Sequence, residues 1–254
     1  MGAVAGRIVG QSIPRTENAR LLTGRGRFVA DVELPRMLHA AFVRSYLPHA
    51  VIDQVQLDEA IALRGVANVL VAADLPDVHM SSSRHSKLAI TPQPPLAHDK
   101  VRFVGEAVAI ALADNRYLAE DAADLVQVYY TPVNSGAPLY DHIPDNLVFH
   151  DAEVIGPVDR AFDEAHHVTR QELDMARQNA SPMEARGCVA DFDPVARRLT
   201  VYSCTQGPHR LRRDLAGVTG LNEHQIRVVI LDIGVGSARR SPPRLRMSPS
   251  YSRP

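Results

Sequence analysis

Residues 182–236 follow one pattern that limits the folds open to this chain: strand, turn, strand, helix and strand, closed by a glycine-rich turn. The apolar run at 226–231 predicts a buried strand, which leads directly into the sequence DIGVG at 232–236. A glycine-rich turn after an apolar strand lets backbone N–H groups approach an anion or a cofactor closely. The other predicted elements are strands at 187–192 and 199–203, a turn at 193–197 and a helix at 210–218. We therefore expect a binding site to begin at the glycine turn.

The pattern ends after Gly236, because residues 237–254 hold five Arg, five Ser and four Pro without any periodicity. Such a composition cannot bury a core, so this segment is expected to be disordered. Two readings stand: a basic docking tail, or a frameshift inside the glycine turn of a GC-rich gene. The loss of the pattern within a few residues favours the frameshift, and the bias of the chain toward Arg, with 26 Arg against two Lys, indicates a GC-rich gene.

Composition excludes several classes of function. The formal net charge is −1 although the last eighteen residues carry five Arg, so residues 1–236 are acidic and give no electrostatic case for nucleic acid. The hydrophobic fraction of 45% allows a sizeable core. No apolar run reaches the ~20 residues of a membrane span, and the N-terminus lacks an export signal, so a cytoplasmic location without membrane contact is expected.

The chain has two cysteines, Cys188 and Cys204, and they form no CxxC pair. An iron–sulfur cluster needs more thiolates than this, so no such cluster is expected in the chain itself. A disulfide between them stays open, although two buried free thiols are the favoured reading. His166 and His167 lack metal-ligand spacing.

Periodicity predicts one mixed α+β domain over residues 20–132, preceded by an extended N-terminal segment. The run at 107–113 is apolar on both faces, which indicates a strand in the centre of its sheet. Asn115 is placed to cap the helix that follows, and Asp58 to cap an earlier one. The expected elements are strands at 37–43, 50–57, 66–72, 101–103, 107–113 and 126–130, and helices at 59–64 and 116–125. Beyond them we expect a loop at 79–95, a linker at 134–157, a helix at 159–165 and a strand at 168–173.

Three stretches resemble the α/β-hammerhead domain in the large subunit of molybdenum hydroxylases, the xanthine dehydrogenase, aldehyde oxidase and aerobic carbon monoxide dehydrogenase family. They are RLLTGRGRF at 20–28, LHAAFVRS at 38–45 and LAHDKVRFVGE at 96–106, in the order and spacing of the family. The resemblance implies five regions. They are an extension at 1–19, the hammerhead domain at 20–132, a linker at 133–158, the incomplete start of a molybdopterin-binding domain at 159–236 and an off-pattern tail at 237–254.

The second half is similar to the opening of the molybdopterin-binding domain, through PMEARG at 182–187 and SCTQGPH at 203–209. The resemblance assigns Gln206 a hydrogen bond to an oxo ligand of molybdenum, a role that suits an uncharged amide donor. Without the resemblance, Gln206 reads as a polar residue before a helix. Glu184 is expected to order the structure near the site rather than to catalyse.

The family continues with a GGGFG loop, which Gly234 and Gly236 match as expected cofactor-binding positions. Val235 and Ser237 depart from that loop, and a side chain at 235 conflicts with its backbone geometry. The glutamate that serves the family as base has no counterpart before the resemblance ends, so no catalytic residue is assigned.

The resemblance implies oxidative hydroxylation of an aldehyde, a heteroaromatic carbon or carbon monoxide. It implies a molybdenum–molybdopterin cofactor, held as a dinucleotide, and no FAD in this chain. It also implies three partners: an iron–sulfur small subunit, an FAD-binding medium subunit and the missing part of the molybdopterin domain. Three hypotheses follow for the chain, namely an enzyme fragment that is inactive alone, one half of a split enzyme, or a non-catalytic assembly module.

Overall fold

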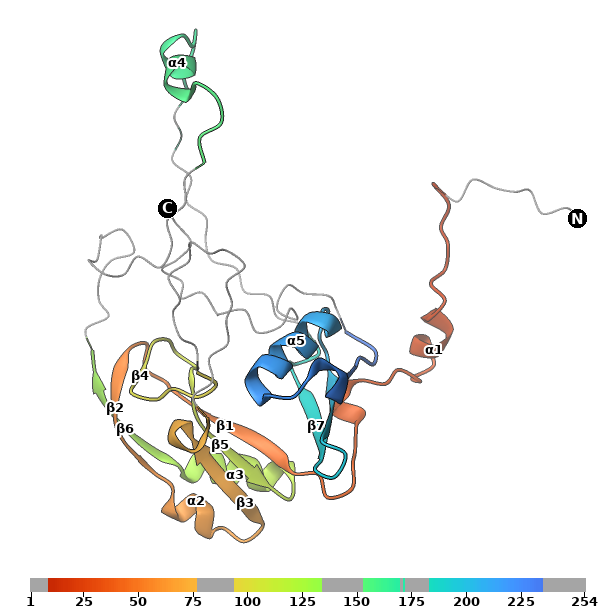
Figure 1. The fold of residues 1–254 in the computed structure, drawn as a ribbon, viewed down its shortest axis with the longest axis vertical. Coiled ribbons are helices and arrows are strands. Elements are labelled where there is room, and N and C mark those ends of the chain that lie inside the picture. The colour runs from red at the N-terminus through yellow and green to blue at the C-terminus, as the bar shows by residue number, and fades with distance from the viewer. Residues whose placement is uncertain (1–8, 77–93, 134–152, 170, 172–182, 235–254) are drawn as a thin grey trace, which may run out of the picture. The chain divides into compact units, whose positions relative to one another are not determined.

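The computed structural model describes residues 9–76, 94–133, 153–169, 171 and 183–234. It divides into two compact units (Figure 1). Among the described residues, unit 1 contains 9–32, 183–216 and 221–234, and unit 2 contains the rest. The mixture of helices with mostly antiparallel strands confirms the predicted α+β class.

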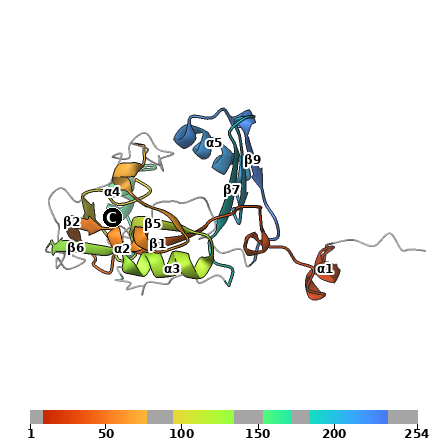
Figure 2. The same ribbon diagram turned by 90° about the horizontal axis from the view of Figure 1, so that it is seen from below.

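Unit 2 is built on a three-stranded antiparallel sheet in the order β1 (His39–Arg44), β5 (Ala107–Ala113) and β3 (Val66–Val71). The central place of β5 confirms the prediction made from its two apolar faces. Helix α3 (Arg116–Leu125) runs along one face of this sheet (Figure 2). The small side chains of β5 allow that close approach, since Ala109, Ala111 and Ala113 are fully buried.

A second antiparallel sheet in unit 2 has the order β4 (Lys100–Val101), β2 (Ala50–Gln56) and β6 (Gln127–Pro132). Val55 and Val128 pack against the cores of both sheets. The predicted strand at 101–103 is shorter than expected, because the chain turns after Val101 onto Glu106. The Glu106 carboxylate accepts a hydrogen bond from the Arg102 amide, and its burial raises the pKa of this side chain.

The helix ends of unit 2 test two predicted caps. The Asn115 side chain accepts a hydrogen bond from the Leu118 amide at 3.0 Å, which confirms it as the cap of α3. The cap predicted at Asp58 is wrong, because α2 (Asp58–Ala62) already includes this residue and begins after Leu57. An acid in the first turn favours the helix dipole equally well, so sequence alone does not separate the two positions.

Unit 1 contains a three-stranded sheet in the order β7 (Cys188–Asp193), β8 (Arg198–Ser203) and β9 (Ile226–Val229). Helix α5 (Pro208–Thr219) connects β8 to β9 and lies beside the sheet (Figure 1). Leu215 and Ala216 of α5 pack against the sheet's buried residues, which include Leu199 and Ile226. These elements match the predicted strand, turn, strand, helix and strand.

The remaining elements are short. Unit 1 also holds α1 (Asn18–Leu22) and the 3-10 turns η1 (Val29–Asp31) and η3 (Glu223–Gln225), whereas η2 (Ala72–Asp74) and α4 (Val158–Asp163) fall in unit 2. Gly236, Val235, the tail at 237–254, most of the loop at 79–95 and most of the linker at 134–157 lie outside the described residues. Of the strand predicted at 168–173, residues 168, 169 and 171 are described and belong to no strand, and the other three lie outside the described residues.

Candidate functional site

The strand directions of unit 1 bring three separate segments to one edge of the sheet. Strands β8 and β9 are parallel, with Leu199 opposite Ile226 and Tyr202 opposite Val229, so both end at the same edge. Strand β7 is antiparallel to β8, with Cys188 opposite Ser203, so it begins there. The segments at 183–187, 204–207 and 230–234 therefore meet at this carboxyl edge, which is where ligands bind in sheets with parallel strands.

Gln206 lies in the turn between β8 and α5, and its side chain is exposed. The turn is fixed on both sides of Gln206. Thr205 is buried, and its hydroxyl accepts a hydrogen bond from the Gly207 amide at 3.1 Å. The Gly207 carbonyl in turn accepts from the Leu211 amide at 2.9 Å, while Pro208 fills the first helical position, where no N–H is needed. A rigid turn thus presents an uncharged amide at the edge of the sheet, just before a helix N-terminus.

Cys204 joins the Gln206 turn to the segment before β7. It is buried, and its sulfur accepts a hydrogen bond from the Gly187 amide at 3.4 Å. The sulfur also lies 3.8 Å from the Ala185 carbonyl oxygen and 3.6 Å from that of Gly187. Both cysteines are free thiols, as expected, but only Cys204 is buried; the expectation that Cys188 is buried as well is wrong, because it lies exposed at the start of β7.

Glu184 joins the segment before β7 to the segment after β9. Its Oε2 atom accepts a hydrogen bond of 2.7 Å from the Gly234 amide, fifty residues away in sequence. This contact gives Glu184 an ordering role at the edge, in line with the reading from sequence. Because the Gly234 N–H already donates to Glu184, it is not available to a ligand. Gly234 can still offer its carbonyl oxygen, and its lack of a side chain lets a ligand approach the backbone.

Asp232 is the residue at this edge that sequence reasoning missed. The guanidinium of Arg20 contacts both of its carboxylate oxygens, and the Arg27 amide donates to Oδ2 at 2.7 Å. The hydrogen bonds from Arg20 and from the Arg27 amide lower the pKa of Asp232 to about 2. The signal available was an acid directly after a buried strand, together with an Arg in the first family stretch.

Two family models cover most of the chain. Residues 23–134 match the aldehyde oxidase and xanthine dehydrogenase a/b hammerhead domain, and residues 139–236 match the molybdopterin cofactor-binding domain. The chain belongs to the large-subunit family of molybdenum hydroxylases. The molybdenum cofactor is therefore a property of its family.

Individual molybdenum hydroxylases show the same relationship. The nicotine 6-hydroxylase large subunit of Paenarthrobacter nicotinovorans is 36% identical over 92% of this chain, and the carbon monoxide dehydrogenase large chain of Hydrogenophaga pseudoflava is 32% identical over 87%. The crystal structure of quinoline 2-oxidoreductase from Pseudomonas putida 86 superposes with a TM-score of 0.81 at 34% identity, and covers 94% of the chain. The chain spans about a third of the length of these relatives, 30% of each sequence and 32% of the solved structure.

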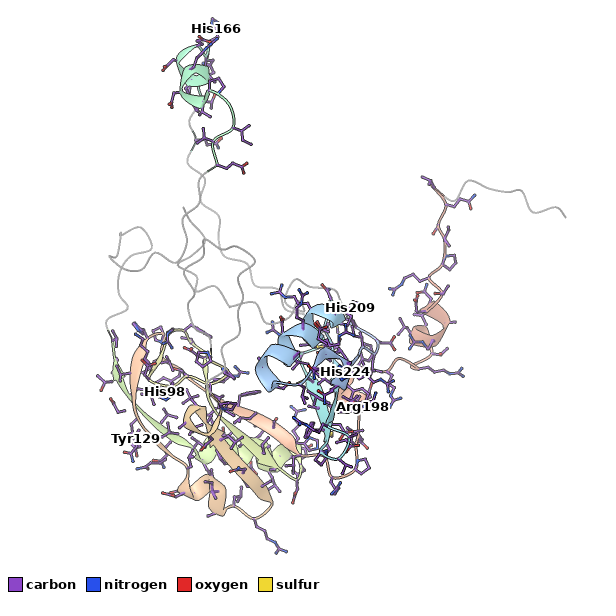
Figure 3. All side chains as sticks on the ribbon, viewed as in Figure 1. His98, Tyr129, His166, Arg198, His209 and His224 are labelled. Carbon is purple, nitrogen blue, oxygen red and sulfur yellow. The ribbon has the colours of Figure 1, made fainter. Side chains whose placement is uncertain are left out.

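Two of the three site residues inferred from the resemblance have positions in the structure, and the roles of all three stay predictions. Gln206 and Gly234 belong to two of the three segments that meet at the carboxyl edge, and Gly236 lies outside the described residues. Among the described residues, no three His, Cys, Asp or Glu side chains are grouped to hold a metal ion. His209 stands in the first turn of α5, and His166 follows α4 (Figure 3). No helix in the described part of this hydroxylase-family chain has the length and apolar character to cross a membrane.

Proposed function

We propose that this chain supplies the N-terminal part of the large subunit of an oxidative hydroxylase, and with it one part of the molybdenum site. The observation that carries the proposal is the meeting of segments 183–187, 204–207 and 230–234 at one sheet edge, with Gln206 exposed there. Two of these segments lie within the family sequences PMEARG (182–187) and SCTQGPH (203–209). A site assembled from three distant segments on one edge is more specific than any of the motifs alone.

The residues at this edge fit the cofactor. When bound, the molybdenum cofactor supplies the redox chemistry of hydroxylation of an aldehyde, a heteroaromatic carbon or carbon monoxide. Gln206 offers neutral N–H donors to an oxo ligand, so it holds the group without adding charge. Gly234 offers close approach of the backbone, because a side chain there would occupy the space of the ligand.

Residues 1–254 alone are expected to give no hydroxylase turnover. The family's general base, on the resemblance, belongs to the part of the large subunit that this chain does not match. We propose that turnover requires the remaining molybdopterin domain, together with an iron–sulfur small subunit and an FAD-binding medium subunit as electron acceptors. Substrate choice belongs to the same unmatched part.

The test is complementation. The chain is produced alone, and also together with the unmatched two thirds of the nicotine 6-hydroxylase large subunit, and each preparation is assayed for molybdenum and for oxidised pterin fluorescence. We expect cofactor only in the complemented sample, and a Gln206→Ala variant should retain about tenfold less. Gln54→Ala, which removes an exposed glutamine in unit 2, is the matched control and should retain the cofactor fully.

Two results would overturn this proposal. One is full cofactor retention by Gln206→Ala. The other is copurification of the chain with the partner subunits while neither sample contains molybdenum or pterin, which would instead identify an assembly module.

A further inference from the structure

The N-terminal segment at 20–32, named here the strap, is hydrogen-bonded to the candidate site although about 200 residues separate them in sequence. The Arg27 amide donates to Asp232 Oδ2 at 2.7 Å, and the Asp232 amide donates back to the Arg27 carbonyl at 2.8 Å. The Arg20 guanidinium contacts both oxygens of the same carboxylate. Asp232 therefore binds the strap through its backbone and through its side chain.

The strap also has a packed end that fixes its position. Val29 and Val32 are buried, at 6% and 3% exposure, and a Cβ atom built on Gly187 would lie 3.6 Å from Val29 Cγ1. The Asp31 carboxylate accepts a hydrogen bond from the Phe28 amide at 2.8 Å, which closes the turn at η1. The strap is thus anchored beside Gly187, in the segment before β7, as well as at Asp232.

Both anchor points are next to contacts that shape the site. Asp232 is two residues from Gly234, whose amide is bound by Glu184. Gly187 is bound to Cys204, two residues before Gln206. A continuous set of hydrogen bonds and packing contacts therefore runs from the strap to all three segments of the carboxyl edge.

We propose that Arg20 and Asp232 are positioning residues: the strap holds the segment at 232–234 so that Gly234 meets Glu184, and the edge keeps its binding shape only while the strap is docked. The cofactor-related part of this inference rests on the proposed function. The contacts of Asp232 with Arg20 and with the Arg27 backbone are named here the latch. The latch depends only on residues within unit 1. It gives the sequence RLLTGRGRF a role at the cofactor edge, beyond its place in the resemblance to the hammerhead domain.

The geometry of the latch distinguishes it from an ordinary surface ion pair. Exposed pairs add little stability, because two long side chains lose entropy and solvent screens the charges. Here the carboxylate is already held by the Arg27 amide, so Arg20 meets a partner that is fixed in place. A guanidinium matches two carboxylate oxygens at once, whereas an ammonium offers a point charge, so lysine should replace Arg20 only in part.

Hydrogen exchange of the complete 254-residue chain, resolved to single amides, tests the latch. In Arg20→Met, the amides of Asp232 and Gly234 should exchange about fivefold faster, while β8 amides stay unchanged, because local opening frees only the segment after β9. Arg20→Lys should fall between Met and the wild type. The control is Arg116→Met, which removes a more exposed ion pair (Arg116 to Glu120, 2.8 Å) in unit 2 and should leave both amides unchanged.

A second variant keeps the test decisive if Arg20→Met is poorly folded. Asp232→Asn preserves shape and an acceptor for the Arg27 amide but removes the charge that Arg20 binds, so it should speed exchange at Gly234 as well. Unchanged exchange at both amides in a folded Arg20→Met or Asp232→Asn chain would overturn the latch.

Cofactor retention in the complemented sample separates this inference from the proposed function. Faster exchange in the variants, with no pterin in the wild type, would leave the latch standing and reject the cofactor role. Pterin in the wild type, with unchanged hydrogen exchange in the variants, would support the cofactor role and reject the latch.

Discussion

The two units of this chain are held together by different kinds of interaction. Unit 2 has two packed sheets and a core rich in fully buried alanines, such as Ala50, Ala109 and Ala111. The described core of unit 1 is smaller, with Leu199, Val201, Leu221 and Ile226 at 4–9% exposure. Its carboxyl edge, the candidate site, depends on polar contacts between distant segments. Unit 2 is therefore shaped mainly by apolar burial, and the carboxyl edge of unit 1 mainly by hydrogen bonds.

The largest expected effect comes from removing buried apolar volume in unit 2. Leu96 is 2% exposed and is among the largest fully buried side chains, so Leu96→Ala should lower the free energy of unfolding by about 2–5 kcal/mol. Denaturant unfolding monitors the loss, and hydrogen exchange in β3 and β5 assigns it to unit 2. Val104→Ala, at a 55% exposed position in the same unit, should change stability by less than about 0.5 kcal/mol. An equal rise in the hydrogen-exchange rate of the β8 amides would contradict the distinction between the units, because it would mean that they unfold together.

The next effect compares two glycines with positive φ, one in each unit. Gly65 in unit 2 has φ +95°, and an added Cβ would lie 2.8 Å from Leu118 Cδ1, so Gly65→Ala combines backbone strain with crowding. Gly24 in unit 1 has φ +72° and nothing within 4 Å of an added Cβ, so Gly24→Ala carries backbone strain alone. We expect the free energy of unfolding to fall by about 2–3 kcal/mol in Gly65→Ala and by about 1 kcal/mol in Gly24→Ala. Thermal unfolding measures both, and equal losses would show that the Leu118 contact adds nothing.

The same difference between the units decides what could be predicted from sequence. Strand β5 and the Asn115 cap were predicted correctly, because a seven-residue apolar run and a local cap leave a pattern within a few residues. The contact of Arg20 with Asp232 joins residues 212 apart, and that of Glu184 with Gly234 joins residues 50 apart. Such pairs leave no periodic signal, since each partner alone is an ordinary charged residue or glycine.

The candidate site was reached from sequence in a different way. Gln206 was singled out by resemblance to the family, because a polar residue before a helix has no distinctive pattern of its own. The resemblance gave no physical reason for Gln206 and Gly234 to lie close together. The parallel pairing of β8 and β9 gives that reason, because it places the turn at Gln206 and the segment at Gly234 on one edge of the sheet. The complementation experiment tests the roles of both residues.

The smallest expected effect is a pair of opposite pH dependences, one from an acid in each unit. The pKa of Asp232 in unit 1 is about 2 because Arg20 and the Arg27 amide bind its charged form, so its stabilising contribution is present above the unfolded pKa of about 3.9. That contribution should be lost as the pH falls from about 4 through 2, seen as a decreasing protection factor at the Asp232 amide.

The pKa of Glu106 in unit 2 is raised because burial disfavours its charged form, so its effect on stability has the opposite sign. Unit 2 should lose stability as the pH rises from about 4.3 through this raised pKa, and Glu106→Gln should remove that loss. If both acids showed the same sign, the view of a latch in unit 1 and a desolvated carboxyl in unit 2 would be wrong.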